Sequence, residues 1–397
     1  MKGVLRIVVL TTLLVVTHTV GAEPNDSGVS FSGSGFLTLA AGNIFKGGKS
    51  ENFNQYHSPI YVVDYAQAGI YEDKEWSIKP GSKIGWQETA TFSPEVSITG
   101  QLVSRASRNG KVDLEWLYAN LGLTDNLTLQ IGRKRLPLFY YSEVQDVGFS
   151  YPWTSLPPGQ YGWEIVNYNG ANLLYRSQWG AWTSVLEAFA GSETRNDNPY
   201  WKVYNGRDIR TDSRWTNILG ASLSLTHGDF ETRLAYIRSE FQNRTADPSV
   251  SPPPFLYSPK ARQQIYSVSS TATVHNWLLH GEYLYMDRAQ TGAAEYSSLL
   301  GIGYRMGRYL PMLTYNRYWE TLKPGRADPS VADPTTIDPL GFEGWSTLTA
   351  SLRYALTATS DIKAEVGRWV DRNGPTFNGG VSYGNPWVFS VSYDLVF

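Results

Sequence analysis

The chain has 397 residues, with 34 Lys and Arg against 36 Asp and Glu, and no cysteine. The near-neutral charge gives no argument for nucleic-acid binding. The absence of cysteine excludes disulfides, Cys-ligated zinc, iron–sulfur clusters and a cysteine nucleophile. The mean hydropathy is negative, which excludes a bundle of membrane helices but allows a β-barrel, in which only alternate residues face lipid.

Residues 1–22 have the features of a secretory signal peptide. Lys2 and Arg6 carry positive charge, residues 7–16 form an apolar core, and residues 20–22 are small enough for a cleavage site. The alternative, an uncleaved anchor helix, is disfavoured because the apolar run is short for spanning a bilayer. We therefore expect cleavage near Ala22, with residues 23–397 forming the mature domain.

From Val29 onward, apolar and polar residues alternate with period two rather than with the 3.6-residue period of a helix. In the last segment, Trp387 and Phe389 fall on one face of a strand, whereas Ser390 and Asp394 fall on the other. Segments of this kind recur along the whole mature chain. The expected strands are 29–41, 83–92, 95–105, 112–122, 126–133, 170–178, 182–191, 214–227, 229–243, 262–274, 277–287, 295–306, 309–319, 343–355, 360–371 and 386–397.

The links between these segments alternate between short and long. Short links with hairpin-turn chemistry stand at 92–94, 124–126, 178–181, 227–229, 275–276, 307–308 and 358–360. Long links stand at 42–82, 106–111, 134–169, 192–213, 244–261, 288–294, 320–342 and 372–385. Tight turns on one rim, long loops on the other and both termini on the short-turn side are typical of outer-membrane barrels. We predict an all-β fold, a transmembrane antiparallel β-barrel of about 16 strands, with 14 or 18 as alternatives.

A large soluble β-sandwich or propeller would also contain many alternating strands. It would not explain the alternating link lengths, or the aromatic residues near strand ends, such as Trp116, Trp179 and Trp277. A sheet in hydrocarbon must close on itself, because lipid offers no partner for the backbone groups of an open edge. Sixteen strands enclose a lumen too wide for wall side chains to fill, so the geometry indicates a channel.

The link 134–169, after the fifth expected strand, is long and rich in proline and aromatic residues. We expect it to fold into the barrel as a constriction loop. Its aromatic residues either form a surface on which sugars stack or pack the loop against the barrel wall. We favour the packing interpretation. These aromatic residues are Tyr140, Tyr141, Phe149, Tyr151, Trp153 and Tyr161.

The C-terminal residues resemble the assembly signal of Gram-negative outer-membrane proteins. Tyr393, Leu395 and the terminal Phe397 alternate with Asp394 and Val396. This resemblance implies recognition by the barrel-assembly machinery and a location in the outer membrane of a Gram-negative bacterium, in contact with outer-membrane lipid and lipopolysaccharide.

The mature chain as a whole resembles the Gram-negative porins and, more narrowly, a porin-like family. The resemblance rests on SKIGWQ at 82–87, Gly132-Arg133, PLFYYS at 137–142, DVGFSYPW at 146–153 and PP at 157–158. General trimeric porins carry a loop folded into the lumen after strand five, which agrees with the position of 134–169. The chain lacks the Pro-Glu-Phe-Gly-Gly type signature that those porins carry in this loop, so the resemblance predicts neither the detailed path of the loop nor the preferred solute. The resemblance implies a homotrimer, with which the small residues Gly33, Gly35, Ala40 and Ala41 of the first strand agree.

No catalytic, metal or cofactor site is expected, so the relevant chemistry is selectivity, set by charges at the narrowest point. The hypothesis is that carboxylates of the loop face a basic patch of the wall and produce a transverse field. For each residue, the alternative is a solvated charge with no selective role. The direction of Arg133 is open because it is out of phase with Thr128 and Gln130. The carboxylates are Glu143, Asp146 and Glu164, and the basic residues are Arg105, Arg133, Arg135, Arg176, Arg233 and Arg353.

The expected function is passive diffusion of ions and small hydrophilic solutes through an outer-membrane porin. The alternatives are a substrate-specific or gated channel and a structural or adhesive barrel. An enzyme built on a barrel would need a base beside a nucleophile. His280, in phase with Glu282, is the one histidine expected in the lumen, and the sequence places no nucleophile beside it, so we expect no enzyme.

Overall fold

The computed structural model describes residues 28–48, 55–246, 254–288, 293–322, 342–375, 377, 380 and 382–397. Sixteen antiparallel strands of these ranges form one closed barrel, which confirms the predicted fold class and strand number. The expected signal peptide, residues 1–22, lies outside the described residues. The barrel strands are β1 (Ser30–Lys46), β4 (Lys83–Ser93), β5 (Val96–Arg105), β6 (Val112–Gly122), β7 (Leu127–Arg135), β8 (Asn167–Trp179), β9 (Trp182–Arg195), β10 (Thr211–His227), β11 (Phe230–Ala246), β13 (Ala261–Val274), β14 (Trp277–Arg288), β15 (Ala293–Tyr304), β16 (Tyr309–Leu322), β17 (Gly344–Ala355), β18 (Ser360–Asp371) and β19 (Trp387–Val396).

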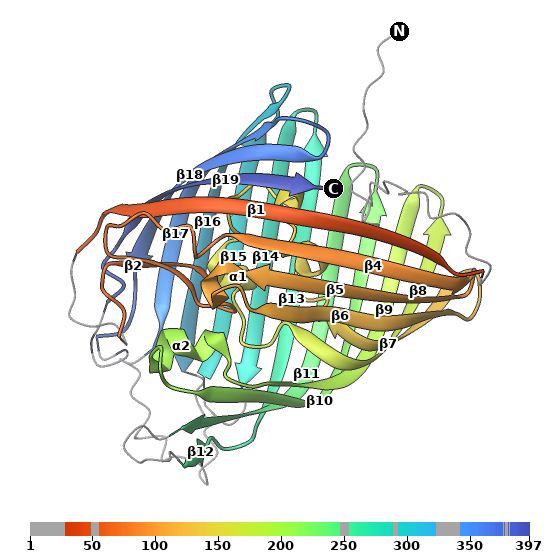
Figure 1. Cartoon of the computed structure of the whole chain (residues 1–397), viewed down its shortest axis with the longest axis horizontal. Coiled ribbons are helices and arrows are strands. Elements are labelled where there is room, and N and C mark those ends of the chain that lie inside the picture. The colour runs from red at the N-terminus through yellow and green to blue at the C-terminus, as the bar shows by residue number, and fades with distance from the viewer. Residues whose placement is uncertain are drawn as a thin grey trace.

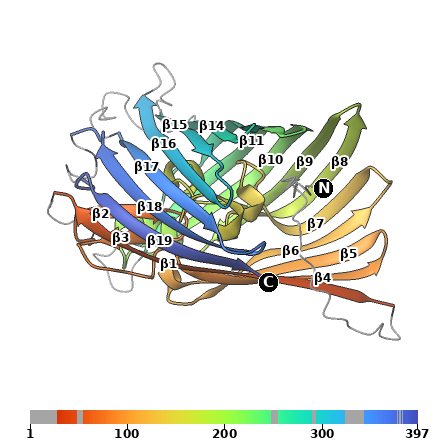
Figure 2. The same ribbon diagram turned by 90° about the horizontal axis from the view of Figure 1, so that it is seen from above.

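The barrel closes through β1, which pairs with both the last strand and the next barrel strand. Leu37 stands opposite Leu395 of β19 and opposite Ile84 of β4. All other barrel strands pair with their neighbours in sequence. The ring leaves no unpaired strand edge, which satisfies the backbone groups of every strand within the sheet (Figures 1 and 2).

The two faces of the wall have opposite chemistry. On β18, Ile362 points outward and is 44% exposed, whereas the adjacent Lys363 points into the lumen and is fully buried. The same alternation holds on β19, where the buried side chains of Ser390, Ser392 and Asp394 face inward. The wall therefore exposes apolar residues outside and encloses polar residues inside, the reverse of a soluble protein.

Two aromatic bands mark the height of the apolar outer surface. Near the long loops, Tyr236, Tyr266, Tyr285, Tyr296 and Trp319 stand directly opposite one another on neighbouring strands, with ring centroids 5.0 to 6.0 Å apart. Near the short turns, Trp277 packs on Tyr304 and Tyr309 on Tyr354. Trp277 and Tyr285 are eight residues apart on β14, which places the bands about 20 Å apart on a tilted strand. We call the first set the aromatic ladder.

Several strands run farther toward the long loops than the sequence predicts. β1 continues to Lys46 and β9 to Arg195. Arg195 still pairs with Ser213 of β10, because polar residues continue a ladder once a neighbouring strand offers hydrogen bonds. The long links also hold elements that we expected as plain loops: β2 (Ile60–Asp64), β3 (Gly69–Glu72), β12 (Phe255–Tyr257), α1 (Pro158–Tyr161), α2 (Pro199–Asn205) and three 3-10 turns, Ala106–Arg108, Ser142–Val144 and Gly148–Ser150.

The small residues of β1 are divided between its two faces. Ala40 faces the lumen and is buried. Gly35 faces outward, but the ring of Phe397 covers it so closely that a Cβ there would lie 2.4 Å from the ring. Phe397 also exchanges both backbone hydrogen bonds with Gly35, so the glycine closes the seam of its own barrel. In the described ranges, no helix is long and apolar enough to cross a membrane.

Candidate functional site

Residues 136–166, between β7 and β8, run through the barrel interior, where Figures 1 and 2 show them as yellow coils surrounded by strands. Contacts to distant strands hold the segment across the lumen. The Trp153 Nε1 donates to Thr314 Oγ1 of β16 at 2.8 Å, and Lys363 Nζ of β18 donates to the Gly148 carbonyl at 2.5 Å. The Ser267 hydroxyl of β13 donates to the Leu138 carbonyl. We call this segment the inserted loop.

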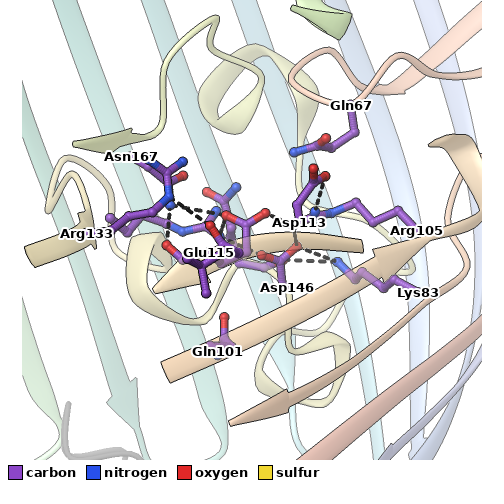
Figure 3. Close-up of polar contacts among 12 residues, drawn as sticks. Gln67, Lys83, Gln101, Arg105, Asp113, Glu115, Arg133, Asp146 and Asn167 are labelled. Atoms are coloured by element: carbon purple, nitrogen blue, oxygen red, sulfur yellow. Dashed lines mark hydrogen bonds and ion pairs between the residues drawn. The ribbon is translucent and has the colours of Figure 1, made fainter. Parts of the chain in front are cut away.

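Four buried charges join the inserted loop to the wall (Figure 3). Arg105 Nη2 of β5 lies 2.7 Å from both Glu115 Oε1 and Asp146 Oδ1. Arg135 Nη2, at the end of β7, lies 2.9 Å from Glu115 Oε2 and 2.6 Å from Asp146 Oδ2. Lys83 Nζ approaches Asp146 Oδ1 at 4.0 Å. Each arginine thus bridges the same two carboxylates. We call Arg105, Glu115, Arg135 and Asp146 the charge cluster.

The charge cluster keeps the Asp146 carboxylate ionised. Burial raises the pKa of Asp146, but Arg105, Arg135 and Lys83 outweigh it and hold that pKa well below its usual value. Because Asp146 touches its cations, the charges neutralise one another locally instead of facing each other across open space. The sequence hypothesis assumed separated charges at this position, and the geometry differs from it.

A second ion pair joins the inserted loop to β11. Arg233 Nη1 of β11 donates to Glu143 Oε2 at 2.9 Å and to the Phe139 carbonyl at 2.8 Å. The Arg233 side chain is buried, whereas the Glu143 side chain is 35% exposed. Arg353 also contacts the loop, with its guanidinium 4.7 Å from the Phe149 ring centroid, and it pairs with Asp361 at 2.6 Å. Glu143 is therefore the loop carboxylate with most access to the lumen.

The remaining expected site residues lie away from these contacts. Glu164, at the end of the inserted loop, is buried and accepts from Trp215 Nε1 at 2.9 Å, with Arg288 Nη2 at 3.3 Å. Arg176 is exposed on β8, nearer the short turns. The structure thus brings Arg105, Arg135, Arg233 and Arg353 to the inserted loop but not Arg176.

The Arg133 side chain does not follow the inward and outward alternation of its strand, because the barrel wall bends beside it. Gly132 has φ of +139° and stands opposite Gly170, which stands opposite Gly191. A Cβ on any of these glycines would lie within 2.3 Å of a backbone oxygen. At this bend, Arg133 Nη1 reaches Glu193 Oε2 of β9, so its ion pair joins wall strands and not the inserted loop.

The aromatic residues of the inserted loop pack it against the wall. The Tyr140 hydroxyl donates to Glu231 at 3.1 Å, and the Tyr161 hydroxyl donates to Glu282. Tyr140, Tyr141, Tyr151, Trp153 and Tyr161 are all buried. This arrangement supports the packing interpretation of these residues over a sugar-stacking surface.

His280 belongs to the same packing. Its Nε2 lies 2.8 Å from Glu282 Oε1, and the rings of Tyr140, Tyr141 and Trp153 surround it at centroid distances of 5.3 to 5.9 Å. In the described part of the chain, no hydroxyl nucleophile is hydrogen-bonded to His280. The pair therefore has a docking role beneath the inserted loop.

The sequence did not reveal a second insertion, the β2–β3 hairpin of the first long link. The hairpin lies over the inserted loop at the long-loop end of the barrel (Figure 1). Tyr61 packs on Trp369 at a centroid distance of 5.6 Å, and the Ile60 N–H donates to the Tyr383 carbonyl. A cavity of about 40 Å³, lined in part by Asp64 and Lys83, separates the hairpin from the inserted loop. That volume holds about three water molecules, so little free space remains between the hairpin and the inserted loop at this point.

One carboxylate ties the hairpin to the other long loops. Glu343, just before β17, accepts from Tyr383 at 2.6 Å, from Trp345 Nε1 at 3.0 Å and from Tyr204 of α2 at 3.0 Å. Tyr65 of the hairpin link stacks on both Tyr204 and Trp345 and donates to the Tyr383 hydroxyl at 2.9 Å. We call these five residues the latch. Buried Tyr and Trp clusters without a regular spacing cannot be recognised in the sequence. The apolar run Ile60–Val63, which follows a proline, could have indicated the strand β2.

No protein-family model matches the chain, and no curated protein sequence matches it. Solved outer-membrane structures are similar to it. The channel DcaP of Acinetobacter baumannii has a TM-score of 0.58 at 11% identity, over 94% of this chain and 99% of that one. OmpF of Salmonella typhi, in complex with daunomycin, has 0.54 at 12%, over 94% and 99%. The trimer form of OmpT, an outer membrane protein of Vibrio cholerae, has 0.51 at 10%, over 93% and 100%. At these identities the likeness establishes the fold alone.

Proposed function

We propose that this chain is an outer-membrane porin, a channel through which ions and small hydrophilic solutes diffuse passively. The observation that carries the proposal is the closed 16-strand barrel with an apolar outer face and a polar interior. Such a surface suits lipid outside and water inside. The fold that the chain shares with solved outer-membrane channels agrees with this reading.

The lumen between the inserted loop and the short turns supports a water-filled passage. Gln87, Thr89, Ser97 and Asn120 face it and are only partly buried. Their side chains hydrogen-bond to side chains of the neighbouring strand, as in the Thr89–Thr99 contact of 3.0 Å and the Asn120–Ser97 contact of 3.1 Å. Hydroxyl and amide walls of this kind favour polar solutes without fixing one chemical class.

The narrow region lies where the inserted loop and the β2–β3 hairpin meet. A solute moving inward from the long loops passes Asp64 of the hairpin, then Lys83 and the charge cluster. We infer that these groups limit passage to small solutes, and that Glu143, whose side chain is 35% exposed, presents charge to solutes below the narrow region. Cofactors and nucleic acid have no part in this reading.

A liposome swelling assay tests the proposal. The folded protein is reconstituted into vesicles, which are diluted into isotonic solutions of salts, amino acids and sugars of increasing size. We expect swelling rates that fall steeply with solute size, because the passage is narrow. Folded, heat-modifiable protein that admits neither ions nor amino acids would instead favour a structural or adhesive barrel.

The latch favours a second candidate, a gated channel. Tyr65 lies in the first long link, Tyr204 in α2 and Tyr383 in the last long link, and all three meet Glu343 and Trp345 at the start of β17. Release of the latch would therefore free these three loops together. In this reading the described conformation is the closed one, and passage widens when the hairpin moves. The solute class would then depend on what releases the latch.

The latch predicts a pH-dependent conductance. Burial raises the pKa of Glu343 to about 7, against hydrogen bonds from Tyr383, Tyr204 and Trp345, and nearby Glu295 raises it further. A released Glu titrates near 4.3, so the latched state holds the proton more tightly. The latch is therefore strongest below about pH 4.3 and weakens as pH rises to about 7. We expect bilayer conductance to be higher at about pH 8 than at about pH 5.

Glu343→Gln keeps a neutral side chain and should flatten this profile at the low, acid-like conductance. Glu95→Gln, in a short turn at the other rim, is the matched control and should retain the wild-type profile. A conductance that rises on acidification, or a Glu343→Gln protein with the full pH response, would contradict the latch as the titrating element.

We further propose a homotrimer in the outer membrane, inserted by the barrel-assembly machinery through Tyr393, Leu395 and Phe397, after cleavage near Ala22. The trimer form of OmpT, which has a similar fold, supports the oligomeric state. Chemical cross-linking of the folded protein in membranes should give a species of three chains. No enzymatic activity is expected, and lipid or peptide hydrolysis that is lost in His280→Ala would contradict this.

A further inference from the structure

A group of cations stands on the outer wall of β10, β11 and β13, above the aromatic ladder. Arg214, Arg238, Lys260 and Arg262 are all exposed. Within the described ranges, the three arginines form no ion pair, and Lys260 has one weak contact of 3.8 Å to Glu240. We call these four residues the outer basic patch. It holds four positive charges against one negative charge in a chain whose net charge is −2.

The patch faces away from the lumen. On β11, Leu234, Tyr236 and Arg238 share one face, and Leu234 is 48% exposed. The residues between them on the same strand point inward, and Ile237 and Ser239 are 0% and 2% exposed. Arg238 therefore extends the row of side chains that contacts lipid in the proposed membrane location.

The aromatic ladder fixes the height of the patch. The hydroxyls of Tyr236 and Tyr266 both donate to Gln264 Oε1, at 3.3 and 2.8 Å, so the rings point their polar ends toward the long loops. Gln264 stands directly opposite Arg238, and Glu240 stands opposite Arg262. Arg238 is thus one strand repeat above the ladder, about 7 Å along the strand. Aromatic residues with this orientation mark the head-group level of a bilayer.

Charges at this level need compensation that the wall itself does not provide. The neighbouring outer side chains Asn217 and Gln264 are neutral, and Asn217 Nδ2 donates to Glu240, which engages the single carboxylate. Arg238 and Arg262 lie on diagonal positions of adjacent strands, about 7–8 Å apart at Cα. Two guanidinium groups at this spacing can bind one phosphate from two sides, because each presents several N–H donors.

We propose that the outer basic patch binds the phosphate of a phosphorylated lipid head group in the leaflet at the level of the long loops. This inference rests on the proposed membrane location, and it adds the residues that recognise the lipid. The alternative source of the same chemistry is free phosphate in solution. Lipid differs from it because the acyl chains would lie against the exposed apolar row below the ladder.

The test uses the folded, full-length mature barrel in a neutral detergent. Short-chain phosphatidic acid, short-chain phosphatidylcholine and inorganic phosphate are titrated separately, and bound molecules are counted by native mass spectrometry. The variant is Arg238→Gln/Arg262→Gln. The matched control is Arg305→Gln/Arg308→Gln, which removes two exposed arginines at the short-turn rim. Heat-modifiable mobility on a gel verifies that each protein is folded.

We expect phosphatidic acid to bind the wild type and the control equally, and the double variant on the order of tenfold more weakly. Arg238→Lys/Arg262→Lys retains the charge and should bind more tightly than the Gln variant. Equal binding by the wild type and the Gln variant would overturn the proposal. Inorganic phosphate that displaces the lipid with the same variant dependence would assign the patch to a free anion and also overturn it.

Conductance of the same preparations separates this inference from the proposed function. A barrel that conducts ions but does not distinguish the variants in lipid binding would remove the lipid site alone. A barrel that binds the lipid through Arg238 and Arg262 but never conducts would keep the site and remove the channel.

Discussion

Replacing residues 49–76 by a ten-residue Gly/Ser linker is expected to raise single-channel conductance several-fold. Gly42 pairs directly with Ser77, and residue 48 is six residues farther along the chain. A linker of ten residues, which reaches about 33 Å when extended, is therefore long enough to join residues 48 and 77. The change removes the β2–β3 hairpin and Tyr65 of the latch, which fill the lumen above the inserted loop. Resistance of a pore is concentrated at its narrowest part, so widening this level changes the conductance most. Planar-bilayer recording in concentrated KCl measures the effect.

Two point variants refine this experiment. Tyr65→Ala removes the stacked ring at the centre of the latch. Like removal of the hairpin, it should increase the current, here by raising the open probability of the channel. Trp76→Ala lies in the same long link, but its side chain is 63% exposed, so its conductance should match the wild type. If hairpin removal left conductance unchanged, the narrow region would have to lie elsewhere.

Asp146→Asn is expected to have the largest effect on stability among single changes in the site. It leaves Arg105 and Arg135 buried with Glu115 as their remaining shared carboxylate, and it also removes the charge nearest Lys83. Breaking a buried pair by removing one partner costs about 3–5 kcal/mol. We therefore expect the inserted loop to undock, with a lower temperature for the heat-modifiable gel shift and noisy, larger current steps.

Glu143→Gln provides the control for that variant. Glu143 lies in the same loop and pairs with Arg233, but its side chain is 35% exposed. Arg233 would keep its hydrogen bonds to the Phe139 carbonyl and to Ser224, so we expect a smaller cost than that of Asp146→Asn. Equal gel-shift temperatures for the wild type, Asp146→Asn and Glu143→Gln would show that the charge cluster does not hold the loop.

The sequence predicted the barrel well because lipid imposes a strict rule on the wall. Every second residue must be apolar outside, so Ile362 and Lys363 can be assigned to opposite faces from their positions alone. Arg105, Arg233 and Arg353 likewise stand in the inward phase of their strands. Strand ends were less certain, because pairing above the lipid level no longer depends on hydrophobicity.

The interior of the lumen follows no such rule. The position of Arg105 in its strand shows that its side chain points inward, but it does not show that the side chain contacts Asp146. Which loop carboxylate reaches Arg105 depends on the path of the inserted loop. The displacement of Arg133 depends on the bend at Gly132, which a period-two pattern cannot express. The latch was missed for a similar reason, because Tyr65 and Glu343 meet only through the packing of links far apart in sequence.

Single-channel recording of the wild-type protein distinguishes a channel from a barrel that does not conduct. We expect stable, small conductance steps in folded protein at neutral pH, which grow when residues 49–76 are replaced. Folded protein that gives no steps, before or after that replacement, would contradict a channel and leave the barrel with a structural or adhesive role.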